Sequence, residues 1–206
     1  MGHHCCQKNP VDLNINKLEK QQKKALIFAL IINSVVFLCE LYGGFLAHSK
    51  SILADSVHLF SHLFVIILTL LVLKKNLIWK ARAAFIKGLL IASLGFSIFL
   101  ESFFSLFLSE HFPDGHLMGS VAIITFIGNG LTLWVLAKHR TEDINMKSAW
   151  VCTQADLYTN LVLILVSILV SIFHSGWPDS LLGLILGGSI LRSALKLLWQ
   201  TRYQLR

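Results

Sequence analysis

The stretch SILADSVHLFSHLFVIILTLLVL (residues 51–73) joins an apolar run of membrane length to three ionisable side chains. An α-helix needs roughly 20 mainly apolar residues to cross a bilayer, and this stretch supplies them. Its first half nevertheless carries Asp55, His58 and His62. Ionisable groups inside a membrane span are energetically costly, and they mark a pathway or a binding site by default. We therefore expect a membrane-spanning helix that contributes to a functional site.

The whole chain has the composition of a protein that crosses the membrane several times. Of its 206 residues, 55% are hydrophobic and only 14% are charged, whereas a soluble domain carries about 25% charged residues. Short connections with turn signals separate the apolar segments. Six of these segments are long enough to be spans: 25–47, 51–73, 83–108, 117–137, 148–173 and 181–199. The sequence therefore predicts an all-α fold with six transmembrane helices.

The basic residues lie almost entirely on one side of the predicted membrane. Of the 18 Lys and Arg residues, all except Lys50 fall in the N-terminal tail, in or beside the connections after the second and fourth spans, or towards the C-terminus. Lys and Arg favour cytoplasmic loops, and an even number of spans puts both ends on the same side. We expect both termini in the cytoplasm, anionic lipid as the neighbour of the basic residues, and no nucleic-acid partner.

The predicted organisation is a cytoplasmic tail over residues 1–24, a transmembrane domain over 25–201 and a short cytoplasmic end over 202–206, in a multi-pass protein of the bacterial inner membrane. The tail contains a His/Cys cluster: His3, His4, Cys5 and Cys6. Such tracts bind metal readily, so the tail is interpreted either as a metal-capturing arm or as a flexible end whose ligands are incidental. A homodimer that pairs through the spans or the tail is an open alternative to a monomer.

Two predicted spans carry potential metal ligands at helical spacing. His58 and His62 are four residues apart in the second span, and Cys152 and Asp156 are four residues apart in the fifth. Residues at this spacing lie on one face of a helix, and the helical rise puts all four near the middle of the bilayer. Two adjacent helices with two ligands each make the tetrahedral pocket that Zn²⁺ prefers. The alternatives are a hydrogen bond between helices for the histidines and a packing role for Cys152.

Further polar residues in the spans accompany this predicted site. They are Asp55, Glu40, Glu101, Asn33, Asn129 and Asn160. Asp55 is interpreted as a residue that orients a histidine or as one near the helix end. Asn160 is interpreted as a residue that supports a ligand or lines the pathway, and the other four as pathway residues or interhelical hydrogen-bond partners. We expect no enzyme activity. No haem is expected either, because His58 and His62 lie on one face of one helix and cannot bind opposite sides of one iron.

Four segments resemble the spans of cation diffusion facilitators, in the order of that family. NSVVFLCELYGGFLAHSKSILADSVHLFSH (33–62) is similar to the first two spans, where the family typically has Asn, Glu, two Gly, Ser and an LADA-like motif before His-x-x-x-Asp; this chain has His58-x-x-x-His62 at the last motif. FIGNGLTLWVL (126–136) and SAWVCTQADLYTN (148–160) are similar to the fourth and fifth spans. WPDSLLGLILGGSILRSALKLLWQT (177–201) is similar to the sixth. The resemblance covers nearly all of the predicted transmembrane domain.

This resemblance implies an exporter of divalent metal, usually Zn²⁺, that is driven by inward movement of protons. The family binds its ion between the second and fifth spans, and those family residues correspond to His58, His62, Cys152 and Asp156. The chain departs from the family pattern in three ways. His62 stands where the family usually has Asp, Cys152 stands where it usually has His, and the given sequence holds no counterpart of the family's C-terminal cytoplasmic domain.

The two substitutions allow opposite interpretations. If Cys152 is a thiolate in the metal-bound state, it and Asp156 still neutralise a dication, and the sulfur shifts preference towards softer ions such as Zn²⁺ and Cd²⁺. The expected cargo is then Zn²⁺, or Cd²⁺ or Co²⁺, with protons as counter-ion and no prosthetic group. The alternative is a non-transporting regulatory or partner subunit that keeps the fold and has an altered metal site.

Overall fold

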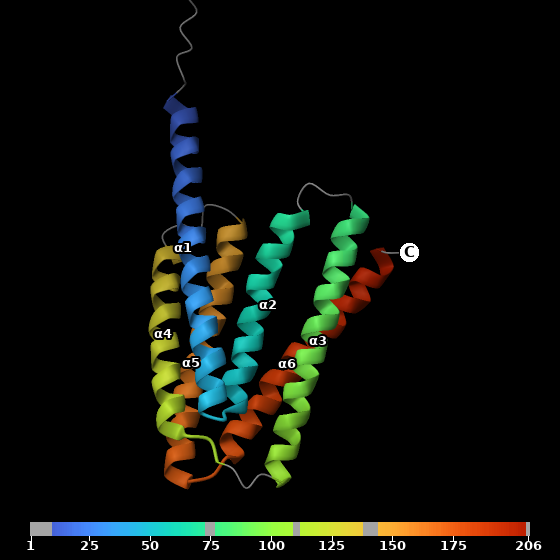
Figure 1. Ribbon diagram of the computed structural model, residues 1–206. Helices are drawn as coiled ribbons and strands as arrows, with labels where there is room; N and C mark the ends of the chain where they lie inside the picture. Colours follow the sequence, from blue (N-terminus) through green and yellow to red (C-terminus); the bar gives the residue numbers. More distant parts are fainter. Residues whose placement is uncertain (1–9, 73–76, 109–111, 138–143, 205–206) are drawn as a thin grey trace, which may run out of the picture.

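The structure of the protein, a computed structural model, describes residues 10–72, 77–108, 112–137 and 144–204 (Figure 1). Some helical side chains within these ranges, including those of His62 and Cys152, lie outside the description. The described residues form six α-helices: α1 (Pro10–Leu46), α2 (Lys50–Val72), α3 (Leu77–Leu108), α4 (Gly115–Ala137), α5 (Ile144–Phe173) and α6 (Trp177–Gln204). The predicted all-α fold with six helices is confirmed over this part of the chain.

Successive helices run in opposite directions, so the bundle has two distinct ends. The start of α1 and the C-terminus lie at the same end, which we call the terminal end (Figure 1). The α1–α2, α3–α4 and α5–α6 connections lie at the opposite end, which we call the loop end. The charge distribution predicts a cytoplasmic terminal end, because Lys50 is the one Lys or Arg that the sequence places at the loop end.

The helices extend beyond the predicted spans at the terminal end. α1 begins at Pro10 rather than at residue 25, and α6 continues to Gln204 rather than ending at residue 199. The added turns are rich in Lys, Glu, Gln, Arg and Leu, which are good helix formers. The later part of the predicted N-terminal tail is therefore the first part of α1. Hydropathy had marked only the apolar part of each helix.

Four of the described helices, α1, α3, α4 and α5, are long and apolar enough to cross a bilayer by composition alone. Large apolar side chains cover the outside of the bundle, and Trp134 and Phe107 are 76% and 72% exposed. So extensive an apolar surface is expected of a protein surrounded by lipid.

The bundle consists of two packed groups joined by α2. α1, α2, α4 and α5 surround an apolar core whose buried members include Ile52, Met118 and Leu163. α3 and α6 pack closely against each other, and a Cβ added to Gly187 would lie 3.1 Å from the backbone nitrogen of Phe99. α2 also packs on both α3 and α6. This arrangement brings α2 into contact with α5, the other helix that carries predicted ligands.

Candidate metal-binding site

His58 of α2 and Asp156 of α5 face each other inside the bundle. The Nε2 atom of His58 lies 3.7 Å from the Oδ1 atom of Asp156. The Asp156 side chain is 5% exposed, whereas the His58 side chain is 43% exposed. The structure thus brings together one residue from each of the two predicted ligand pairs, although they are far apart in the sequence.

The separation of these two atoms suits a shared metal ion. Zinc binds imidazole nitrogen and carboxylate oxygen at about 2.1 Å in tetrahedral geometry, so two such ligand atoms lie about 3.4 Å apart. The observed 3.7 Å between His58 and Asp156 is close to that value. Small side-chain rotations would absorb the difference, so the pair can accept one zinc ion without a rearrangement of the helices.

Two further carboxyl groups are buried beside this pair. Glu40 of α1 is 0% exposed and Asp55 of α2 is 2% exposed, and both are near enough to Asp156 to interact with it electrostatically. Both Glu40 carboxyl oxygens and Oδ2 of Asp55 lack a hydrogen-bond partner among the described residues. No Lys or Arg is among the buried side chains that the structure describes. Buried carboxylates without a cation are very unfavourable, so this region requires protons or a metal ion.

A chain of hydrogen bonds supports the turn of α5 that carries Asp156. Thr125 Oγ1 of α4 donates to Asn160 Oδ1, and Asn160 Nδ2 donates to the backbone carbonyl oxygen of Asp156 at 2.9 Å. Thr125 and Asn160 are each 0% exposed. The hydrogen bond from Thr125 to Asn160 joins α4 to α5, a contact that the sequence did not predict. Because both ends of the Asn160 amide are used, this residue holds α4 and α5 in register beside the site.

The other predicted polar residues fall into two environments. Asn129 of α4 is 0% exposed, and both of its amide atoms lack a partner among the described residues, as does Oδ1 of the partly buried Asn33. Unused polar groups inside a membrane bundle are costly and are tolerated where they line a polar path. Glu101 of α3 is on the surface instead, where its Oε2 atom pairs with Nζ of Lys50 at 2.9 Å.

Several predicted ligands lie outside the described residues. These are the side chains of His62 and Cys152 and the tail residues His3, His4, Cys5 and Cys6. Among the side chains that are described, no three His, Cys, Asp or Glu residues could hold a metal ion together. The helix directions nevertheless put residue 62 one turn beyond His58, and residue 152 one turn before Asp156. Both positions are therefore about 6 Å nearer to the terminal end than the His58–Asp156 pair.

The sequence reasoning missed the buried threonines of this region. Thr125 and Thr132 of α4 are 0% exposed, and Thr153 of α5 is 3% exposed. Threonine is unremarkable in an apolar span because its hydroxyl can bond to its own helix, as Thr132 Oγ1 does to the Gly128 carbonyl oxygen at 3.1 Å. Their spacing could have indicated that they are buried, because Thr125, Asn129 and Thr132 recur along one face of α4.

The chain matches the sequence profile described as the cation efflux transmembrane domain over residues 26–205. That match spans almost all of the 206 residues. The chain belongs to the cation efflux family. As a member of this family of membrane transporters, it is a multi-pass integral membrane protein and not an enzyme. The family resemblance inferred from the motifs is confirmed.

Several named metal transporters are distant relatives of this chain. The cadmium, cobalt and zinc/H(+)-K(+) antiporter of Bacillus subtilis (strain 168) is 24% identical over 191 residues, which cover 86% of this chain and 61% of that protein. Zinc transporter ZitB of Escherichia coli (strain K12) is 24% identical over 196 residues, with 87% and 61% covered. ZitB of Pectobacterium atrosepticum is 27% identical over 208 residues, with 93% and 64% covered. The chain thus spans less than two thirds of these relatives.

Proposed function

We propose that the protein exports divalent metal cations, with zinc as the main substrate, from the cytoplasm in exchange for protons. Cadmium and cobalt are the further substrates in this proposal. Membership of the cation efflux family supports it, as do the relatives whose names specify zinc, or cadmium, cobalt and zinc. The metal is the cargo and the proton is the counter-ion. The protein would lie in the bacterial inner membrane, with its terminal end in the cytoplasm.

The contact between His58 and Asp156 is the single observation that carries this proposal. It joins α2 and α5 at 3.7 Å between potential ligand atoms. His62 and Cys152 follow one turn away on the same helix faces by their spacing. We assign the metal site to these four residues, two from each helix, which supply the four ligands of a tetrahedral zinc ion.

The charges of the four proposed ligands suit a dication. Two neutral imidazoles, the Asp156 carboxylate and a Cys152 thiolate would together carry two negative charges, which balance Zn²⁺. Forming the thiolate releases a proton when metal binds, as a metal–proton exchange requires. Sulfur also favours softer ions, so Zn²⁺ and Cd²⁺ should bind more tightly than Mn²⁺ or Mg²⁺.

Buried polar residues on both sides of this site supply the proposed path. On α1, Asn33 lies seven residues nearer to the terminal end than Glu40, about 10 Å along the helix. On α2, Asp55 lies three residues nearer to the loop end than His58, about 4.5 Å along the helix. Zinc would enter from the terminal end and leave past Asp55 at the loop end when the helix groups rock against each other.

Reconstitution of the purified protein into liposomes tests the proposal directly. Zinc flux under a pH gradient should be present for the wild type and lost for Asp156→Ala, His58→Ala and Cys152→Ala. Asp114→Asn is the matched control, because Asp114 caps α4 at the loop end by accepting hydrogen bonds from the N–H groups of His116 and Leu117. Asparagine caps a helix equally well, so flux through this variant should be unchanged.

Two results would contradict different parts of the proposal. Wild-type flux in the Asp156→Ala and His58→Ala variants would remove the assigned site. A purified wild-type protein that binds zinc and moves none across the membrane would instead support the non-transporting alternative.

A further inference from the structure

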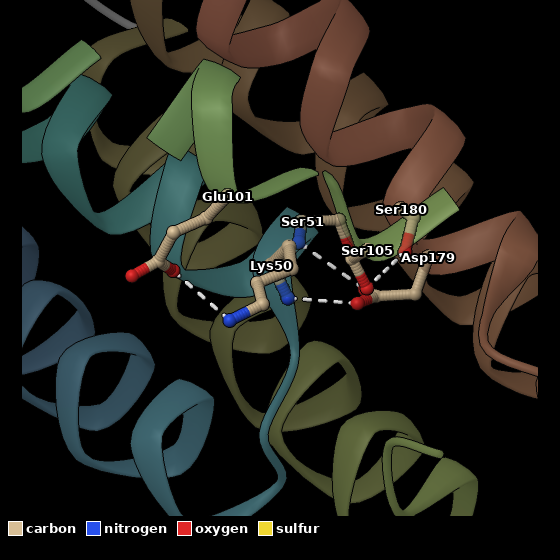
Figure 2. Close-up of polar contacts among 6 residues, drawn as sticks. All are labelled: Lys50, Ser51, Glu101, Ser105, Asp179 and Ser180. Carbon is tan, nitrogen blue, oxygen red and sulfur yellow. Dashed lines mark hydrogen bonds and ion pairs between the residues drawn. The ribbon is translucent and has the colours of Figure 1, made fainter. Parts of the chain in front are cut away.

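The first turn of α2 is held by a carboxylate from α6 (Figure 2). Asp179, which is 1% exposed, accepts hydrogen bonds from the N–H groups of Lys50 at 2.7 Å and of Ser51 at 3.1 Å. The hydroxyl groups of Ser49, at 2.7 Å, and Ser51 donate to the same carboxylate. The first N–H groups of a helix lack partners within that helix, and a negative charge beside them is stabilising. Asp179 is therefore an N-terminal cap supplied by another helix.

This carboxylate completes the hydrogen bonding of the α2 N-terminus. The Ser49 hydroxyl oxygen accepts from the Ile52 N–H at 3.2 Å, and the Leu53 N–H donates to the Ser49 carbonyl oxygen at 3.3 Å. Only the N–H groups of Lys50 and Ser51 depend on Asp179. Without it, both would need new acceptors, and burial makes an unpaired N–H costly. The cap therefore ties the position of α2 along its own axis to α6.

α3 takes part in the same junction, so α2 is joined to the α3–α6 pair at the loop end. Lys50 Nζ pairs with Glu101 Oε2 at 2.9 Å, and the hydroxyl groups of Ser180 and Ser105 are hydrogen-bonded at 2.9 Å (Figure 2). The α6 backbone also approaches α2 closely, because a Cβ added to Gly183 would lie 3.1 Å from the Lys50 carbonyl carbon. The loop end of α2 is thus held by both helices of that pair.

The same helix carries His58 about two turns beyond the cap. The eight residues from Lys50 to His58 correspond to about 12 Å of helix, too short a distance to absorb an axial shift by bending. α2 touches α5 at few points, whereas it packs extensively on α1, α6 and α3. The height of His58 relative to Asp156 is therefore set by these three helices rather than by direct contact with α5, and the Asp179 cap is the buried polar contact that fixes it from the α6 side. Metal–ligand distances vary by only about 0.2 Å, so a small axial shift of α2 matters.

We propose that Asp179 is a positioning residue for the metal site, acting through α2. It holds α2 in register with α5, so that the ligands of the two helices meet, and it couples that register to the α3–α6 pair. This inference rests on the proposed function, since it concerns the same metal site. Asp179 caps α2 about two turns before His58, so it acts on the site through the helix rather than as a ligand.

Zinc affinity and thermal stability of the purified full chain, measured separately, test this role. Asp179→Ala should weaken zinc binding by about 10–100-fold, as loss of residues that orient ligands does in other metal sites. Asp179→Asn keeps one acceptor oxygen, so its loss of zinc affinity should be smaller. Bound Co²⁺ should show shifted visible absorption bands in Asp179→Ala, because these bands report ligand geometry. A residue that only stabilises the fold would leave both the affinity and these bands unchanged.

Asp114→Ala is the matched control, since it removes an aspartate cap from α4 at the same end of the bundle. It should lower the melting temperature to a similar degree and leave zinc affinity unchanged. The inference would be overturned if Asp179→Ala bound zinc with wild-type affinity, or if Asp179→Ala and Asp114→Ala lost zinc affinity equally. If Asp179→Ala does not fold, Asp179→Asn and Ser51→Ala decide the matter, and wild-type affinity in both would also overturn it.

Asp156→Asn separates this inference from the proposed function. Weak zinc binding by Asp156→Asn together with wild-type binding by Asp179→Ala would overturn the positioning role alone. Wild-type binding by Asp156→Asn would show that the site itself is assigned wrongly, and the positioning role would fall with it.

Discussion

A double-mutant cycle between His58 and Asp156 would show whether one metal ion joins these residues. The variants are His58→Ala, Asp156→Ala and the double substitution. Each is measured for zinc affinity by calorimetric titration and for metal-free stability by denaturant unfolding. The structure predicts a larger coupling energy in zinc binding than in metal-free unfolding, because the contact between His58 and Asp156 contributes little to stability without a metal ion.

The magnitudes follow from the distance and the exposure of the pair. In the metal-free protein, the contact between His58 and Asp156 at 3.7 Å, with the His58 side chain 43% exposed, should contribute at most about 1 kcal/mol after solvent screening. Residues that share a bound partner couple by about 0.5–3 kcal/mol. We expect about 2 kcal/mol of coupling in zinc binding, which corresponds to roughly 30-fold in affinity.

The outcome that would refute this reasoning is additivity. If the two single losses in zinc affinity add to the double loss within about 0.5 kcal/mol, no single ion joins the two residues. Coupling of equal size in metal-free unfolding would instead identify an ordinary ion pair. A cycle between Asp156→Ala and Asp114→Ala serves as the control, and its losses should be additive.

Three further predictions concern the buried polar residues around the site. Glu40→Gln removes a carboxyl group whose oxygens have no hydrogen-bond partner among the described residues. The stability of the metal-free protein in thermal unfolding should therefore be unchanged or higher, while zinc flux falls. A destabilisation above about 2 kcal/mol would contradict this prediction. Thr125→Val removes the hydroxyl that donates a hydrogen bond to the buried Asn160 Oδ1, and it should lower the free energy of unfolding by about 1–3 kcal/mol. Ser120→Ala, at an exposed position of the same helix, is the control and should change the free energy of unfolding by less than about 0.5 kcal/mol. Zinc affinity should fall as the pH is lowered from about 8 to about 6, because protons compete for imidazole and thiolate ligands. Zinc titrations of Cys152→Ser should show a weaker dependence of affinity on pH. A wild-type affinity that is independent of pH would argue against these ligands.

Sequence patterns predicted those features of the protein that depend on neighbours along the chain. Apolar runs of membrane length predicted six helices, because a helix satisfies its own backbone hydrogen bonds in lipid. Four-residue spacing placed His58 with His62, and Cys152 with Asp156, because helical periodicity is local. The helix ends were predicted less well, since α1 begins at Pro10 and hydropathy responds to lipid contact rather than to helix propensity.

The chain alone therefore determined the helices, their alternating direction and the faces that bear potential ligands. Only the tertiary structure decided which faces meet: that Glu40 and Asp55 lie beside Asp156, that Glu101 is on the surface, and that Asp179 caps a helix that begins 129 residues earlier. The reason is that the axial height and rotation of each helix come from packing between helices, such as the close contact of Gly187 with Phe99. Local periodicity carries no information about that height, and a carboxylate becomes a ligand, a cap or a surface charge according to the groups it is packed against.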